Sequence, residues 1–128
     1  MSQQSPLILV VEDDPDVSEG MVALLEEEGY RVGAARDGAD GLRHLRENLG
    51  VKLILLDLTM PRMSAGEFRA VQRADPVMSE IPVLLMSANL DVSKQAQALG
   101  VAGYLGKPFR PAALIETIGR LVGPAATA

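Results

Sequence analysis

Several residue types that commonly build functional sites are missing or scarce in this chain of 128 residues. It has no cysteine, which excludes disulfide scaffolds, thiolate metal sites and cysteine nucleophiles. His44 is the single histidine, so a metal site with several histidine ligands cannot form. The two tyrosines and two phenylalanines are too few to build stacking platforms for single-stranded nucleic acid or a flavin ring.

Long apolar runs and an excess of positive charge are also lacking. No stretch approaches the roughly 20 apolar residues that cross a bilayer, and no signal-peptide pattern opens the chain. We therefore expect a cytoplasmic protein without a membrane partner. The formal charge of −5 argues against nucleic acid as a partner. The charge is uneven, because residues 1–30 hold eight of the 17 acidic residues and no Lys or Arg. Such asymmetry marks either a site or a solvated helix face.

Apolar runs and segments of helical spacing alternate along the chain. Five short runs predict β-strands, at 7–11, 31–35, 53–56, 82–86 and 102–105. A segment of helical spacing follows each run. Alternation of this kind predicts parallel strands joined by right-handed crossovers, hence an α/β sheet between two helix layers. We expect one domain, with short tails on either side, over these bounds: domain 6–122, N-terminal tail 1–5, C-terminal tail or linker stub 123–128.

The helix ends carry recognisable signals. Asp14 is a plausible N-cap for the first helix, with Pro15 in its first turn and Gly29 just beyond its end. The third helix, at about 65–74, is expected to carry Phe68 and Val71 as its apolar residues. The second, weaker helix has three apolar positions, at Leu42, Leu45 and Leu49.

Polar residues follow four of the five predicted strands. They are Glu12 and Asp13 after the first, Asp57 after the third, Ser87 after the fourth and Lys107 after the fifth. The carboxyl ends of parallel strands lie at one edge of the sheet, where open α/β folds bind ligands, so we expect these side chains to converge.

The chemistry of this set points to a hard cation. Converging carboxylates repel one another unless a cation shares them, and a few carboxylates with open positions suit Mg²⁺ better than Ca²⁺. Lys107 would hold an anion bound to the metal, and Ser87 could donate a hydrogen bond to it. With Asp57 available as a nucleophile, these are the components that phosphoryl transfer requires.

Four separated motifs resemble the receiver domain of two-component response regulators. They read VVEDDP at 10–15, DLTMP at 57–61, LMSA at 85–88 and YLGKPF at 104–109. The resemblance covers about residues 6–122. Within this family, the chain resembles the single-domain chemotaxis regulators. It implies a flavodoxin-like (βα)5 three-layer sandwich with parallel strands in the order 2-1-3-4-5.

The resemblance also implies a role for each site residue. Asp57 would accept a phosphoryl group from a phosphohistidine on a sensor histidine kinase or a histidine phosphotransfer protein. Asp13 and Asp57 would bind Mg²⁺ directly, the backbone carbonyl of Thr59 would be a third ligand, and Glu12 would act through a water molecule. Lys107 would hold a phosphoryl oxygen. The domain would catalyse its own phosphotransfer and the hydrolysis of the aspartyl phosphate, without being an enzyme for other substrates.

A conformational switch is implied as well. Ser87 would move toward the phosphoryl group and Tyr104 would turn inward with it, while the Lys107–Pro108 peptide bond would be cis. The change would alter the face made by the fourth helix, fifth strand and fifth helix, where an unknown downstream protein would bind. Phosphorylation would thus shift an existing two-state equilibrium.

One segment departs from the family pattern. The loop after the phosphoacceptor usually continues Met-Pro-x-Met-Asp-Gly, but here Ser64-Ala65-Gly66 follows Met63. Ser64 can still cap the third helix. Ala65 resists a positive φ, so either the backbone differs there or Gly66 takes over that role. This departure keeps open an alternative function, a receiver-like interaction module that works without phosphorylation.

Two further classes fit less well. A phosphohydrolase of the haloacid dehalogenase type would need a second Asp where Thr59 stands. Flavin binding would need aromatic walls that the chain lacks. In receiver domains Thr59 and Asn89 occupy variable positions that tune the lifetime of the phosphoryl group.

Overall fold

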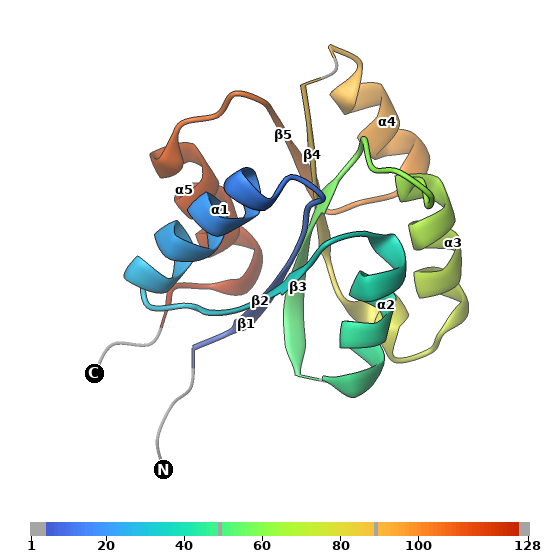
Figure 1. The fold of residues 1–128 in the computed structure, drawn as a ribbon, viewed down its shortest axis with the longest axis horizontal. Helices are drawn as coiled ribbons and strands as arrows, with labels where there is room; N and C mark the ends of the chain where they lie inside the picture. The colour runs from blue at the N-terminus through green and yellow to red at the C-terminus, as the bar shows by residue number, and fades with distance from the viewer. Residues whose placement is uncertain (1–4, 49, 89, 126–128) are drawn as a thin grey trace.

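A computed structural model describes residues 5–48, 50–88 and 90–125. Leu49 and Asn89 lie outside the described residues, as do 1–4 and 126–128 of the predicted tails. In the described part of the chain, parallel strands form one sheet in the order β2-β1-β3-β4-β5 between two helix layers (Figure 1). The predicted fold class and strand order are confirmed.

Strands and helices alternate throughout this part of the chain. Their bounds are β1 Leu7–Val11, α1 Pro15–Glu27, β2 Arg31–Ala35, α2 Gly38–Glu47, β3 Val51–Asp57, α3 Ala65–Ala74, η1 Met78–Glu80, β4 Val83–Ser87, α4 Val92–Leu99, β5 Gly103–Gly106 and α5 Pro111–Val122. Three strands differ from the predicted ones, each at both ends. Strand β3 begins two residues earlier than its apolar run and ends at Asp57 itself, whereas β4 and β5 both begin and end one residue later than predicted. Pairing with neighbouring strands, which local sequence does not report, sets these ends.

The sheet is covered on both faces. Helices α1 and α5 lie on one face, and α2, α3 and α4 lie on the other (Figure 1). Alternate residues of β1 therefore enter two separate cores: Ile8 and Val10 pack on the α1–α5 side, whereas Leu9 and Val11 pack on the α2–α4 side. Burial on both faces explains why the central strands are continuously apolar. Polar side chains are left to the strand ends.

The predicted ends of α1 are confirmed. The Asp14 side chain accepts hydrogen bonds from the backbone N–H groups of Asp16 and Val17, and Pro15 opens the first turn. Gly29, just past the helix, has φ 97°, a conformation that residues with a Cβ rarely adopt. The cap fixes where α1 starts, and so where the preceding acidic segment leaves β1.

The buried face of α3 differs from the prediction. Phe68 is buried as expected, but Val71 is 38% exposed, and the polar residues Arg69 and Gln72 are buried in its place. The reason lies in the backbone that α3 covers. Two carbonyl groups beneath it need donors, and the Gln72 side-chain amide donates to both, at 2.8 and 2.9 Å.

Arg69 joins α3 to α4 through backbone carbonyls. Its Nε donates to Leu99 O at 3.0 Å and its Nη2 to Gly100 O at 2.6 Å, so the guanidinium caps the C-terminal end of α4. A third donor, Nη1, reaches Gln72 Oε1 at 2.8 Å. Burial lowers the pKa of Arg69, with a smaller contribution from the charge of Arg73. The α3–α4 contact is therefore polar and geometrically specific.

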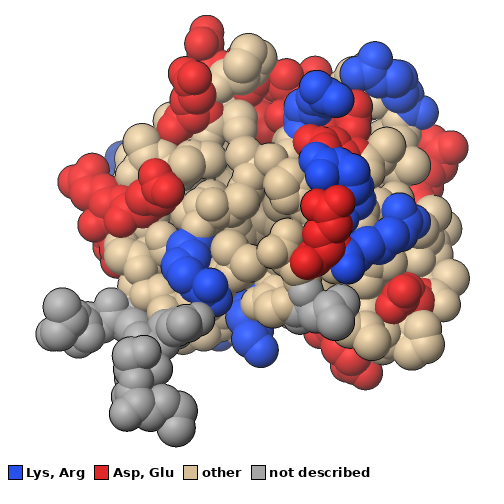
Figure 2. Space-filling view, turned by 60° about the horizontal axis from the view of Figure 1, so that its bottom comes forward, with Lys and Arg blue, Asp and Glu red and all other residues tan. Residues whose placement is uncertain are grey.

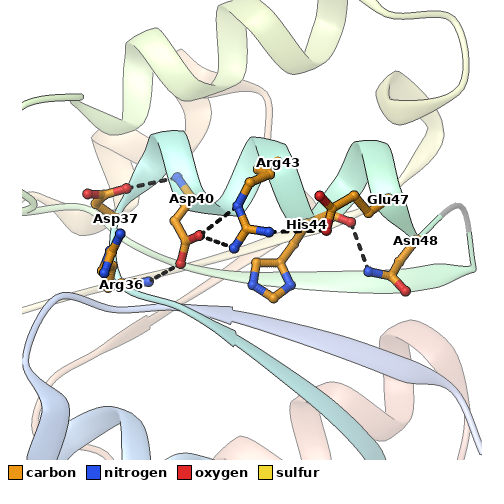
Figure 3. A network of polar contacts seen from close by, with 7 residues as sticks. All are labelled: Arg36, Asp37, Asp40, Arg43, His44, Glu47 and Asn48. Carbon is orange, nitrogen blue, oxygen red and sulfur yellow. Dashed lines mark hydrogen bonds and ion pairs between the residues drawn. The ribbon is translucent and has the colours of Figure 1, made fainter.

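A chain of polar contacts runs along the outside of α2 (Figure 3). Asp37 caps the helix by accepting from the Asp40 N–H at 2.8 Å. Asp40 accepts from the Arg36 N–H and from the Arg43 guanidinium, which also reaches Glu47. The hydrogen bond from Arg43 is the main reason that the pKa of Asp40 is lowered. Exposed pairs of this kind stabilise a helix by roughly 0.2–0.5 kcal/mol each.

Strand β1 begins and helix α5 ends at the same end of the sheet, opposite the carboxyl ends of the strands (Figure 1). The buried Tyr30, just before β2, donates its hydroxyl hydrogen to Gly123 O at 3.0 Å. Arg31 Nε donates to Ser5 O at 2.9 Å. Side chains at the start of β2 therefore hold both ends of the described chain.

Candidate functional site

The polar residues predicted to converge do so at the carboxyl edge of the sheet. Glu12 directly follows β1, Asp57 is the last residue of β3, Ser87 is the last of β4, and Lys107 directly follows β5. Asp57 is in register with Met86, so Ser87 lies one residue beyond it on the neighbouring strand. The parallel register thus brings groups separated by up to 95 residues to one place.

Glu12 and Lys107 form the tightest contact of the site. Lys107 Nζ donates to Glu12 Oε1 at 2.8 Å, and it lies 3.7 Å from Asp57 Oδ2. Glu12 is buried, and its second oxygen accepts from the Asp14 N–H at 3.2 Å. One cation therefore bridges two buried carboxylates, with the shorter contact to Glu12.

The pKa values of the two buried carboxyl groups are shifted in opposite directions by burial and by neighbouring groups. Burial raises the pKa of Asp57 to about 6, and the negative charge of Glu12 adds to this effect. Burial also acts to raise the pKa of Glu12, but hydrogen bonds from Lys107 and the Asp14 backbone outweigh it and lower that pKa. Burial alone would lower the pKa of Lys107, yet Glu12 and Asp57 raise it. The ion pair of Glu12 with Lys107 thus stays charged, while Asp57 holds its proton more readily.

Carboxylate oxygens of Glu12, Asp13 and Asp57 lie within 4.8 Å of one another. Glu12 and Asp57 are buried and Asp13 is exposed, so one side of the cluster faces solvent. The set offers oxygen ligands only, and a cation would relieve the repulsion from Glu12, which adds to the effect of burial on the pKa of Asp57. These residues fit a small hard ion such as Mg²⁺, with room for water and an anion.

The loop after Asp57 is attached to the start of α2. Thr59 N–H donates to Asp57 Oδ1 at 3.3 Å. Further along, Arg62 adopts φ 69°, and its guanidinium lies 3.3 Å from Asp37 Oδ2. Met63 packs against Gly38 so closely that a Cβ added there would lie 2.7 Å from the Met63 sulfur. Two contacts therefore fix the path of the loop.

The departure at Ser64-Ala65 does not disturb α3. Ser64 caps the helix, as predicted, and the structure adds a reciprocal bond with Glu67: Glu67 N–H donates to Ser64 Oγ at 3.1 Å, and Ser64 N–H donates to Glu67 Oε1 at 2.9 Å. Of the two alternatives for this segment, the structure has the first, a different backbone. Gly66 lies inside α3, and the positive φ of this loop is at Arg62.

The remaining predicted residues surround the carboxylates. Ser87 is buried, and its carbonyl accepts from Lys107 N–H at 2.7 Å. The Lys107–Pro108 peptide bond is cis, as the resemblance implied. Tyr104, on β5, is 47% exposed and so is turned toward solvent.

Sequence reasoning missed the pairing of Arg62 with Asp37. The two residues are 25 positions apart, in the loops that precede α2 and α3, which lie beside each other on one face of the sheet. Neither residue belongs to a local pattern that predicts the other. The sequence places Arg62 in the loop after Asp57, but that position does not identify its partner.

Comparison with known proteins agrees with this geometry. Residues 8–119 match the model of the response regulator receiver domain. The chain is 28% identical to the chemotaxis response regulator CheY4 of Vibrio cholerae, covering 92% of this chain and 99% of that one, with a TM-score of 0.85. It is 29% identical to the receiver domain of sensor histidine kinase PA1611 from Pseudomonas aeruginosa, covering 93% and 98%, with a TM-score of 0.85. That structure has a magnesium ion coordinated in the active site cleft.

Longer relatives contain a similar segment. The chain is 35% identical to the DNA-binding response regulator MtrA of Mycolicibacterium smegmatis over 113 residues, which are 87% of this chain and 48% of that protein. It is also 35% identical over 119 residues to hybrid signal transduction histidine kinase D of Dictyostelium discoideum, covering 91% and 8%. The chain thus spans half or less of the length of these relatives. It belongs to the response regulator receiver domain family, the phosphoacceptor domains of two-component signalling.

Proposed function

We propose that Asp57 accepts a phosphoryl group from a phosphohistidine, on a sensor histidine kinase or a histidine phosphotransfer protein, in a Mg²⁺-dependent reaction. The observation that carries this proposal is the convergence of Asp57, Glu12 and Asp13 with Lys107 at one edge of the sheet. Three acidic groups and one cation at strand ends suit the binding of a metal ion and an anion together.

The transfer exchanges one bond to phosphorus for another. A carboxylate oxygen of Asp57 forms the new O–P bond while the N–P bond of the phosphohistidine breaks, and the histidine nitrogen keeps the electron pair. Asp57 must be ionised to attack, although burial raises its pKa to about 6. Lys107 would stabilise negative charge on a phosphoryl oxygen. Hydrolysis by water would later break the O–P bond and restore Asp57, without a separate phosphatase.

Four residues would hold the metal ion. Asp13 and Asp57 would bind Mg²⁺ through their carboxylates, Thr59 through its backbone carbonyl, and Glu12 through a water molecule. When bound, Mg²⁺ would offset the negative charge shared by the phosphoryl group and the carboxylates. Glu12, held by Lys107 and the Asp14 N–H, is positioned to orient that water.

Phosphorylation would act on a partner through the face of α4, β5 and α5. Ser87 would donate a hydrogen bond to the phosphoryl group, and Tyr104 would turn inward from its exposed position. These contacts would exist only in the phosphorylated state, so they would favour the switched conformation. The downstream partner would be another protein.

Location and extent follow from the same proposal. None of the helices in the described ranges is long and apolar enough to cross a membrane. We place the domain in the cytoplasm, where phosphohistidine donors are made, and assign residues 6–122 to it.

Figure 2 shows positive and negative groups interleaved across the face in view, which is not the single-sign surface that nucleic acid requires.

Labelling with a small phosphodonor tests the proposal. Acetyl phosphate with Mg²⁺ should phosphorylate the protein, chelation of Mg²⁺ should prevent it, and Asp57→Ala should abolish it. Asp16→Ala, which removes an exposed carboxylate from the first turn of α1, is the matched control and should label normally. Persistent labelling of Asp57→Ala would refute the assignment. Normal labelling without any change in the spectra of the protein would instead favour an interaction module without a switch.

A further inference from the structure

Strand β5 has an open edge. In the sheet of the described residues it is the last strand, and it pairs with β4. Ala102 N–H donates to Val83 O at 3.0 Å, so the N–H and C=O groups of Ala102, and those of every second residue after it in β5, point toward β4. Those of Gly103 and Leu105 consequently point away from the sheet. An open edge of this kind is a template for one more strand.

Two hollows, each of about 330 Å³, flank this edge. One lies on the α5 side and is lined by Thr117, Arg120 and Leu121. The other lies on the α4 side and is lined by Ser93, Ala96 and Gln97. Three residues, Ala102, Gly103 and Tyr104, line both hollows. Successive side chains of a strand point to opposite faces, so an added strand would offer alternate side chains to the two hollows.

The segment that contains the open edge, residues 92–122, has a net charge opposite in sign to that of the whole protein. Residues 92–122 contain Lys94, Lys107, Arg110 and Arg120 but only one acid, Glu116, which gives +3 against −8 for the rest of the chain. Helix α4 and strand β5 contain no acidic residue. Lys94 belongs to α4, and Arg120 lines the hollow on the α5 side. A cation thus lines the hollow on the α5 side, and the helix beside the other hollow carries one as well.

We propose that the open edge of β5 binds an extended acidic segment of a partner protein, which adds to the sheet as a further strand. Backbone hydrogen bonds to Gly103 and Leu105 would provide affinity, and small apolar side chains would enter the hollows. Acidic side chains would pair with Lys94 and Arg120. A second copy of this chain fits less well, since two regions of +3 would face each other.

Tyr104 connects this surface to the phosphoacceptor, and this step rests on the proposed function. Tyr104 lines both hollows and is half exposed. An inward turn of Tyr104 on phosphorylation would enlarge the hollow on the α4 side. The acidic segment should therefore bind more tightly to the phosphorylated protein than to the unphosphorylated one.

Two synthetic peptides of equal length test the proposal on the whole chain. One alternates Glu with Val, and the other alternates Lys with Val. The Glu peptide should bind, measured by fluorescence polarisation, and should protect the Gly103 and Leu105 amides from hydrogen exchange. The Lys peptide should bind much more weakly. The double reversal Lys94→Glu with Arg120→Glu should weaken binding of the Glu peptide roughly fivefold to tenfold.

The matched control reverses two exposed cations elsewhere, Arg46→Glu with Lys52→Glu, and should leave peptide binding unchanged. Absence of binding, equal binding to both double variants, or protection at other amides would overturn the proposal. Self-association through β5, detected by sedimentation, would assign the edge to a second copy instead. Asp57→Ala separates the two proposals, because it should lose labelling by acetyl phosphate and keep peptide binding in the unphosphorylated state.

Discussion

Lys107 is bonded more closely to Glu12 than to Asp57: its ammonium lies 2.8 Å from Glu12 Oε1 and 3.7 Å from Asp57 Oδ2. The cation proposed to hold the phosphoryl group is therefore already positioned by a buried carboxylate that does not accept the group. Asp57 Oδ2 contacts this cation at longer range, so it is held less strongly than Glu12 Oε1. The site is prepared for an incoming anion before any phosphodonor arrives.

Removing Lys107 should destabilise the metal-free protein. Lys107→Met leaves the buried Glu12 without its cation, and we expect a loss of roughly 1–3 kcal/mol in the free energy of unfolding. Urea titration in the presence of a chelator measures it, and added Mg²⁺ should restore part of the loss. Arg43→Met, which breaks exposed ion pairs on α2, is the control and should change stability by less than about 0.5 kcal/mol. Equal losses in the two variants would contradict the interpretation.

The metal-free protein should lose stability as Asp57 ionises. Its folded pKa is about 6 against an ordinary value of 3.8, so between these values the folded state binds more protons than the unfolded state. Stability from this group is thus present at low pH and declines as the pH rises from about 4 to about 6, by up to roughly 3 kcal/mol. Asp57→Asn should remove the decline and be more stable than wild type at pH 7. Identical pH profiles of the two proteins in chelator would count against the raised pKa.

Gln72 should matter more to stability than Val71, although Val71 is the apolar residue. Gln72→Leu removes the hydrogen bonds that the Gln72 amide donates to the carbonyls of Met78 and Ile81, and also a partner of Arg69, which should cost roughly 2–4 kcal/mol. Val71→Ala, at an exposed position, should cost less than about 1 kcal/mol. Denaturant unfolding of both variants checks this order. A larger loss for Val71→Ala would show that α3 buries a different face.

Gly38 and Met63 should be energetically coupled. A Cβ at Gly38 would lie 2.7 Å from Met63 Sδ and 3.1 Å from Met63 Cβ, so Gly38→Ala must displace the loop residue, at a cost of roughly 1–3 kcal/mol. In a Met63→Ala background the same substitution should cost much less, since only the contact with the Cβ of residue 63 at 3.1 Å remains. A double-mutant cycle by urea unfolding should give a coupling energy of about 1 kcal/mol or more. Additive effects would mean that the two residues do not touch.

Local sequence was sufficient for the elements and for the parts of the site that follow strands. The continuous apolar run before Asp57 predicted a buried strand, and Asp14, Pro15 and Gly29 predicted both ends of α1. Once the strands are parallel, polar residues at their carboxyl ends must converge, so the meeting of Glu12, Asp57 and Lys107 needed no knowledge of side-chain geometry. Strand order came from resemblance rather than from the residues themselves.

What the sequence did not predict depends on contacts between segments far apart in the chain. Burial of Gln72 and exposure of Val71 reflect backbone carbonyls beneath α3 that accept hydrogen bonds from Gln72, which periodicity of apolar residues does not register. The positive φ of Arg62 and its pairing with Asp37 depend on how two loops meet. In each case the cause is a polar or steric requirement of a neighbouring segment.

The placement of the chain ends has a consequence for how such a domain can be used. Because β1 starts and α5 ends at the edge opposite Asp57, and Tyr30 ties Gly123 there, a polypeptide attached at either side would emerge away from the edge that carries the carboxylates. Fusion to a larger protein would then leave the docking of a phosphodonor unobstructed. Because of this geometry, the domain can be joined to very different domains without any change in the residues of its site.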